Sequence, residues 1–163
     1  MGEYERVRHE FPPVYDADCK ILILGSLPSV KSREQMFYYG HPQNRFWRVI
    51  AALTGQIVPQ NIEEKKALLL GQHIAISDVI AECDIIGSSD SSIKNVVPMD
   101  LEQILKGADI RRIYANGNTA KKLFEKFQKK SCQREIIGLP STSPANAAYS
   151  LERLLEAWKC ILD

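Results

Sequence analysis

The sequence lacks the features that mark several common classes of protein. It has no apolar run of about 18 residues and no signal-peptide pattern at its start, which favours a soluble, cytoplasmic protein over one in or on a membrane. Its four cysteines, Cys19, Cys83, Cys132 and Cys160, form no CxxC pair. The spacing typical of a zinc ribbon, an iron–sulfur cluster or a disulfide framework is therefore missing. We expect buried, inert thiols, no metal and no cofactor.

The chain also lacks an excess of charge of either sign. Its 21 Lys and Arg residues against 20 Asp and Glu residues leave a formal net charge of +1. This balance indicates no general affinity for nucleic acid, although a local cleft can be basic inside a neutral protein. The chain has neither an internal repeat nor a linker, and its 163 residues suit one domain. We expect a single domain over residues 1–163.

Strand-like and helix-like patterns alternate along the chain. Short apolar runs predict strands, which lie at 19–25, 73–80, 111–119 and 134–146. Amphipathic spacing and capping residues predict helices, which lie at 45–55, 61–72, 100–107, 120–130 and 150–162. The polar segment at 82–98 contains turn formers throughout. The alternation predicts an α/β fold, a three-layer αβα sandwich with a central, mostly parallel sheet and helices on both faces.

Polar and aromatic residues gather in the loops that follow the predicted strands. These loops lie at 25–44, 77–92, 116–119 and 138–146. Ligands of open α/β sheets bind beyond the carboxyl ends of the strands, so we expect the four loops to form one site. Their Gly, Ser, Asn, Pro and Tyr residues suit a flat, polar, aromatic ligand such as a nucleobase.

Motifs for several other chemistries are missing. The turn at 25–29 (GSLPS) is neither a Walker loop nor GxGxxG, and simple turn formation explains it equally well. His41 could act as a general base, but we favour a structural hydrogen-bonding role. A triad of His41 with Ser141 or Ser143 lacks both the G-x-S-x-G elbow and an orienting Asp. The lysines of 120–130 either form a solvated face or reach phosphates, and the sequence does not decide between these roles.

Three segments together resemble the uracil-DNA glycosylase superfamily, and most closely its hypoxanthine-DNA (deoxyinosine) glycosylase branch. They are GSLPSVKSREQMFYYGHPQNRFWRVI at 25–50, DIIGSSDSSIKN at 84–95 and LPSTSPAN at 139–146. The run HPQNRFW is also similar to HPANRFW of the mismatch-specific uracil glycosylases, which share the αβα fold. The resemblance spans almost the whole chain and implies base excision repair of deaminated bases, chiefly hypoxanthine.

One departure from the mismatch-specific enzymes changes the expected catalytic residue. Their first motif is Gly-x-Asn-Pro-Gly, whose Asn holds the attacking water, and the matching position here is Leu27. The resemblance to the hypoxanthine branch implies instead that Asn44, of HPQN, positions the water. An amide orients water without deprotonating it, which suits a dissociative path with oxocarbenium character in the sugar.

The remaining expected contacts surround the base and the DNA backbone. Donors to the departing base are expected from the turn and from side chains, namely Gly25, Ser26, Leu27, Ser77, Ser88 and Asn116. Asn116 has a competing explanation as a turn former. The resemblance implies that Tyr39 stacks on the flipped base, with core packing as the alternative. It also implies DNA contacts from the last loop, namely from Ser141, Ser143, Pro144, Ala145 and Asn146.

Other interpretations remain open at this level. Neither motif contains a lysine that could form a Schiff base with the sugar, so we expect a monofunctional enzyme. Its expected partner is double-stranded DNA carrying deaminated bases, with single-stranded DNA as the alternative, and we expect a monomer. A uracil or mismatch-type glycosylase and a catalytically silent nucleic-acid-binding domain are the two main alternatives. A nucleoside hydrolase would need acidic clusters for metal, which we do not find.

Overall fold

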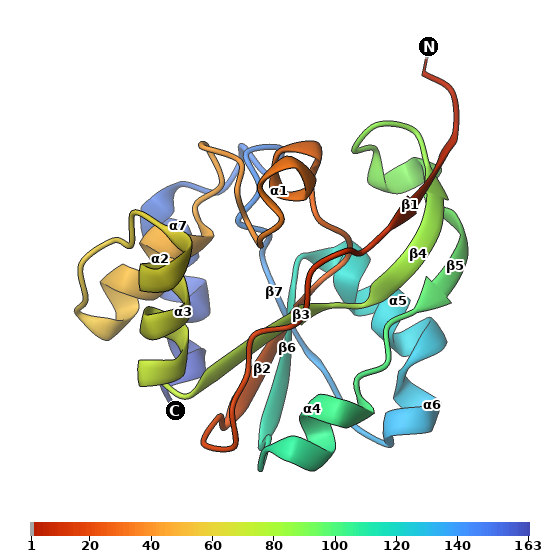
Figure 1. Cartoon of the computed structure of the whole chain (residues 1–163). Coiled ribbons are helices and arrows are strands. Elements are labelled where there is room, and N and C mark those ends of the chain that lie inside the picture. Colours follow the sequence, from red (N-terminus) through yellow and green to blue (C-terminus); the bar gives the residue numbers. More distant parts are fainter. Residues whose placement is uncertain (1) are drawn as a thin grey trace.

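Four parallel strands form the central sheet of the protein, whose computed structural model describes residues 2–163 (Figure 1). In the order in which they pair, they are β3 (Ile74–Asp78), β2 (Ile21–Gly25), β6 (Arg112–Asn116) and β7 (Ile137–Leu139). The register places Gly25 beside Asp78 and Asn116 beside Leu139. All four strands therefore end at one edge of the sheet, where ligands of such sheets bind.

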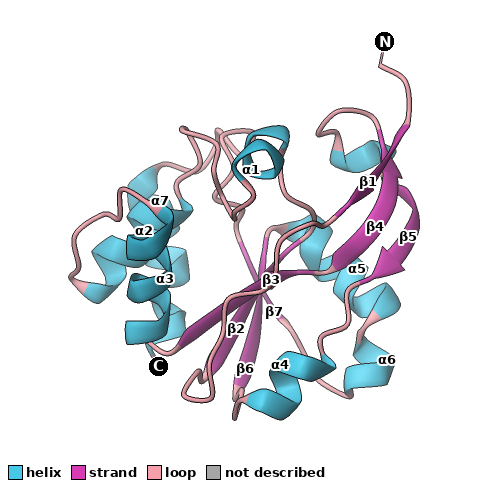
Figure 2. Ribbon diagram, viewed as in Figure 1, coloured by secondary structure: helices cyan, strands magenta, loops and turns pink. Residues whose placement is uncertain are grey.

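Helices cover both faces of this sheet, as Figure 2 shows. Alternation along β2 assigns Ile21 and Ile23 to one apolar core, and Leu22 and Leu24 to the other. The first core includes residues of α2 (Phe46–Thr54), α3 (Ile62–Gly71) and α7 (Leu151–Trp158). The second includes residues of α4 (Glu102–Gly107), α5 (Asn118–Phe127) and the short α6 (Lys129–Cys132). The predicted three-layer αβα sandwich is confirmed.

A second, antiparallel sheet forms where the sequence predicts only turns. In pairing order its strands are β1 (Glu5–Arg8), β4 (Ile80–Ile85) and β5 (Lys94–Pro98). The expectation of a turn-rich segment at 82–98 is therefore wrong at both of its ends. Two register shifts between β4 and β5 interrupt the apolar–polar alternation that marks a strand. Cross-strand ion pairs, such as Arg6 with Glu82 at 2.7 Å, occupy positions where apolar residues would have indicated a strand in the sequence.

Local capping chemistry sets several helix ends. Asn61 Oδ1 accepts the backbone N–H of Glu64 at 2.8 Å and begins α3, as predicted. Gly55 ends α2 with a φ of 68°, a left-handed conformation that glycine adopts without steric cost. Two short helical segments inside the strand-end loops are not predicted; they are α1 (Val30–Gln35) and a 3-10 turn at Asp90–Ser92. Both give fixed geometry to loops that border the sheet edge.

All four cysteines are free thiols. Cys19 and Cys83 are buried as predicted, whereas Cys132 and Cys160 are partly exposed, so the expectation of burial is correct for two of the four. Burial raises the pKa of Cys19 to about 11. This thiol is therefore protonated and weakly nucleophilic at neutral pH.

The described part of the chain, residues 2–163, contains no helix with both the length and the apolar character needed to cross a membrane. Within the same residues, no group of three or more His, Cys, Asp and Glu side chains is arranged to hold a metal ion.

Candidate functional site

A cavity of about 460 Å³ lies at the carboxyl edge of the parallel sheet. The four loops predicted to form one site all contribute to its wall. The first loop supplies residues 25–29, Ser32, Tyr39 and Asn44. The second supplies Asp78 and residues 88–90, the third supplies residues 116–119, and the fourth supplies residues 141–143 and Ala145. The volume is within the range of small-molecule sites in proteins.

Most of the residues singled out from the sequence line this cavity. They are Gly25, Ser26, Leu27, Tyr39, Asn44, Ser88, Asn116, Ser141, Ser143 and Ala145. Asn146 lines a neighbouring groove instead, and Pro144 lines neither. Ser77 is a correction: it is fully buried in β3, does not line the cavity, and its hydroxyl donates to the carbonyl of Asp78 at 3.4 Å. Successive strand residues point to opposite faces, so a strand-end position alone did not identify the exposed one.

Asn44 is held by hydrogen bonds to its side-chain oxygen. Oδ1 accepts the backbone N–H of Phe46 at 2.9 Å and the hydroxyl of Thr142 at 2.8 Å. Because a backbone N–H can only donate, the contact with Phe46 identifies which amide atom is the oxygen. The amide nitrogen makes no hydrogen bond within residues 2–163, so its two N–H groups are the free part of this side chain.

Thr142 connects Asn44 to Asn116. Its hydroxyl accepts from Asn116 Nδ2 at 3.0 Å, and its backbone N–H donates to Asn116 Oδ1 at 3.0 Å. The side chain is fully buried. Sequence reasoning missed Thr142 although it lies between Ser141 and Ser143 in the quoted motif, because three adjacent hydroxyls carry no signal of which one points inward.

Arg45 fixes the last loop against the first. Its guanidinium donates to the carbonyls of Ser143 and Asn146, each at 3.2 Å, and to the carbonyl of Tyr149. Its backbone N–H donates to the carbonyl of Thr142 at 3.0 Å. A rigid planar donor suits this pattern of several acceptors, so the residue after Asn44 determines the shape of a loop about 100 residues away.

Tyr39 presents one face of its ring to the protein interior. The ring stacks on Phe46 with centroids 4.1 Å apart and planes 21° apart. Its hydroxyl is buried and has no partner among the described residues. Burial and then the negative charge of Asp78 raise the pKa of Tyr39 well above its ordinary value, so the hydroxyl stays protonated. Since Phe46 covers one ring face, the opposite face is the one that a ligand could contact.

A buried histidine–carboxyl pair, His9 and Asp78, lies beside Gly25. His9 Nε2 is 2.8 Å from Asp78 Oδ2, and the two side chains are 1% and 4% exposed. A Cβ atom on Gly25 would lie 2.5 Å from Asp78 Oδ1 and 3.0 Å from the Tyr39 hydroxyl. Only glycine leaves room for this arrangement. Neither His9 nor Asp78 was identified from the sequence, because the two residues lie 69 positions apart in the chain and meet only in the fold.

The side chains of two further candidates make structural contacts. Leu27 packs against the apolar core of the second sheet, which includes Ile80 and Cys83. His41 Nδ1 accepts the backbone N–H of Gln43 at 3.1 Å, in agreement with the hydrogen-bonding role favoured from the sequence.

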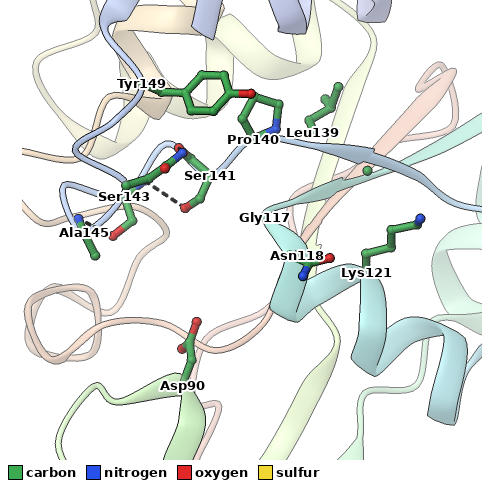
Figure 3. Close-up of a pocket in the computed structure, with 12 residues that line it drawn as sticks. Asp90, Gly117, Asn118, Lys121, Leu139, Pro140, Ser141, Ser143, Ala145 and Tyr149 are labelled. Atoms are coloured by element: carbon green, nitrogen blue, oxygen red, sulfur yellow. Dashed lines mark hydrogen bonds between the residues drawn. The ribbon is translucent and has the colours of Figure 1, made fainter.

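A second, larger groove of about 690 Å³ adjoins the cavity (Figure 3). Figure 3 shows Ser141, Ser143 and Ala145 on one side of it, with Asn118 and Lys121 of α5 on the other. The groove and the cavity share several of their lining residues, namely Asp90, Gly117, Asn118, Ser141, Ser143 and Ala145. A ligand extended along the groove could therefore place one group in the cavity.

The sequence of the chain matches a known family. Residues 12–162 match the model of the uracil DNA glycosylase superfamily, which is almost the whole chain. The chain belongs to this superfamily. The resemblance inferred from the three segments is confirmed.

Individual relatives within the superfamily carry more specific names. A "Hypoxanthine DNA glycosylase" of Methanosarcina acetivorans is 32% identical over 157 residues, which cover 95% of this chain and 98% of that protein. A protein of the same name from Methanosarcina barkeri is 38% identical over 86 residues, 52% of this chain and 54% of the relative. A solution NMR structure of a candidate uracil DNA glycosylase from M. acetivorans matches with a TM-score of 0.79 and 34% identity, covering 93% of each chain.

Proposed function

We propose that this protein is a monofunctional DNA glycosylase that flips deaminated bases out of DNA and hydrolyses their N-glycosidic bonds, chiefly releasing hypoxanthine from deoxyinosine. Membership of the uracil DNA glycosylase superfamily and the names of the two Methanosarcina relatives support the reaction class and DNA as the substrate. The observation that carries the proposal is Asn44, whose amide N–H groups are free at the wall of the cavity while its oxygen is tied to Phe46 and Thr142.

Asn44 orients the attacking water in this proposal. The amide nitrogen donates to the water oxygen, which leaves the other lone pair of the water free to attack the C1′ atom of the sugar. An amide is not basic enough to take the proton, so the glycosidic bond must be largely broken first. The positively charged sugar then captures the water, whose surplus proton passes to the released base anion or to solvent.

The departing base acquires negative charge, which hydrogen-bond donors stabilise. We propose that the turn at Gly25, Ser26 and Leu27, together with Ser88 and Asn116, supplies these donors, since all of them line the cavity. One well-placed donor of this kind changes a rate by about 100- to 1,000-fold. Donors that face O6 would also disfavour adenine, whose amino group leaves them unpaired.

The groove receives the DNA strand. Flipping the base out of the helix costs a few kcal/mol. Stacking on the free face of Tyr39 offsets about 1 to 3 kcal/mol of this cost. Ser141, Ser143, Pro144, Ala145 and Asn146 contact the strand and its minor groove. Of the predicted lysine-rich helix, only Lys121 lines the groove, where it can reach a phosphate. We further propose that residues 1–163 act as one domain and as a monomer on double-stranded DNA.

The test is base release from duplexes that carry a single deoxyinosine or deoxyuridine, with wild type, Asn44→Ala and Asn61→Ala compared. Asn61 is a matched control, because its side-chain oxygen also accepts a backbone N–H in the first turn of a helix and it lies outside the cavity. Each Ala variant loses about 1 kcal/mol of stability with the hydrogen bond to the backbone N–H. Only Asn44→Ala should lose hypoxanthine release, by about 100-fold or more.

A second candidate function is excision mainly of uracil, which the name of the similar NMR structure favours. Release of uracil alone would support this candidate over hypoxanthine excision. Tight binding of lesion duplex without release of either base would indicate a catalytically silent binding domain instead.

A further inference from the structure

Asp78 occupies a position in the cavity that the proposed mechanism does not use. It is the last residue of β3 and lines the cavity beside Gly25 and Tyr39. A carboxylate at the bottom of a cavity is costly to bury unless it is paired and hydrogen-bonded. Its presence at the sheet edge therefore requires a reason beyond packing.

The two oxygens of Asp78 have different surroundings. Oδ2 is held 2.8 Å from His9 Nε2. Oδ1 makes no hydrogen bond among the described residues. It lies 2.5 Å from the position that a Cβ atom on Gly25 would occupy. The side chain keeps 4% of its surface exposed, although the residue is deeply buried. One carboxylate oxygen is thus anchored, and the other is an unused acceptor at the cavity.

A second unpartnered polar group lies beside it. The Tyr39 hydroxyl is buried, has no partner within residues 2–163, and approaches the same point above Gly25 to 3.0 Å. Burial and the negative charge of Asp78 raise the pKa of this hydroxyl, so it stays a protonated donor. Two polar groups without protein partners at one place are typical of a ligand site.

Deamination changes one property of a base that an acceptor can detect. Adenine N1 and cytosine N3 carry lone pairs, whereas hypoxanthine N1 and uracil N3 carry hydrogen. A carboxylate oxygen accepts from N–H and is repelled by a ring nitrogen lone pair. We propose that Asp78 Oδ1 accepts the ring N–H of the flipped base, and that this contact selects deaminated bases over adenine and cytosine.

This inference rests on the proposed function and adds a specificity-determining residue to it. His9 has a positioning role, because its contact with Oδ2 sets the direction of Oδ1. Phe11 and Tyr38 hold the imidazole ring, with centroids 4.4 and 5.5 Å away. Guanine also carries N1–H, so its rejection must depend on the extra 2-amino group and not on Asp78.

The experiment pairs one atom of the enzyme with one atom of the substrate. Single-turnover base release is measured for wild type and Asp78→Asn on duplexes with deoxyinosine or with 1-deaza-deoxyinosine, in which C–H replaces N1–H. Wild type should prefer deoxyinosine by about ten- to a hundredfold, the value of one charge-assisted hydrogen bond. Asp78→Asn should lose a similar factor on deoxyinosine and little on the analogue, so that the preference largely disappears.

A merely structural role for Asp78 would lower both substrates equally and keep the preference, and that result would overturn the inference. Asp84→Asn is the matched control, since Asp84 is also paired with a basic side chain, Arg6, but lies outside the cavity. It should leave both rates unchanged. If Asp78→Asn does not fold, wild type alone decides: equal release from the two duplexes contradicts the contact. Absence of all release by wild type would instead contradict the proposed function.

Discussion

Replacing Thr142 by Val tests whether the hydrogen-bond network around Asn44 holds the site together. Val has nearly the same shape as Thr, with a methyl group in place of the hydroxyl. The substitution removes the 2.8 Å bond to Asn44 and the 3.0 Å bond from the Asn116 amide, while the backbone bond from Thr142 to Asn116 stays. The change is confined to one atom at a fully buried position.

The magnitude follows from the groups left without partners. Each lost bond costs about 1 kcal/mol, and a buried donor or acceptor left unpaired costs about 1 to 3 kcal/mol. We expect Thr142→Val to lose about 2 to 4 kcal/mol, which lowers the melting temperature by roughly 5 to 15 °C in a chain of this size. Release of hypoxanthine should fall by about 10- to 100-fold, because Asn44 is then oriented only by the backbone N–H of Phe46.

Thermal unfolding and single-turnover release from a deoxyinosine duplex measure the two effects. Thr142→Ser keeps the hydroxyl and should restore most of the rate that Thr142→Val loses. A Thr142→Val protein with wild-type melting temperature and wild-type rate would refute the reasoning. A stability loss without any rate loss would show that Asn44 does not depend on this contact.

Three other substitutions give further predictions. Gly25→Ala should lower base release about 100-fold, because its Cβ would lie 2.5 Å from Asp78 Oδ1; an unchanged rate would contradict that close approach. Arg45→Met should destabilise the protein by about 3 kcal/mol. It should also increase amide hydrogen exchange in the loop whose carbonyls Arg45 holds. Unchanged exchange would show that these hydrogen bonds do not order the loop. The ion pair with Arg6 lowers the pKa of Glu82 below its ordinary value of 4.5, so its contribution to stability is present above that pH and is lost as the pH falls through the lowered value. The stability difference between wild type and Arg6→Met should therefore shrink from pH 6 to about pH 3, as urea unfolding at several pH values would measure; a constant difference would speak against the pair.

Periodicity predicted the central fold because it is a local property. The run at 19–25 contains apolar residues for both faces of the sheet, and Ile21 and Leu22 do enter opposite cores. Asn61 and Gly55 marked helix ends through capping that involves only their neighbours in the chain. The second sheet was missed because its pairing is irregular and its exposed positions are charged.

The site was predicted at the level of loops and only partly at the level of side chains. The parallel topology brought the four strand-end loops together, and Asn44 and Tyr39 line the resulting cavity. Ser77 was misplaced, because its strand position does not tell which face it occupies. Thr142 was overlooked between two serines of the same chemistry.

The sequence by itself determined the αβα fold, the edge of the sheet that carries the site, and the motifs that indicated the family. Only the tertiary structure decided which polar groups are paired and which are free. Thr142 meets Asn44 across 98 positions, and His9 meets Asp78 across 69. Whether a buried polar atom has a partner depends on such distant contacts, and a pattern read along the chain contains only near ones.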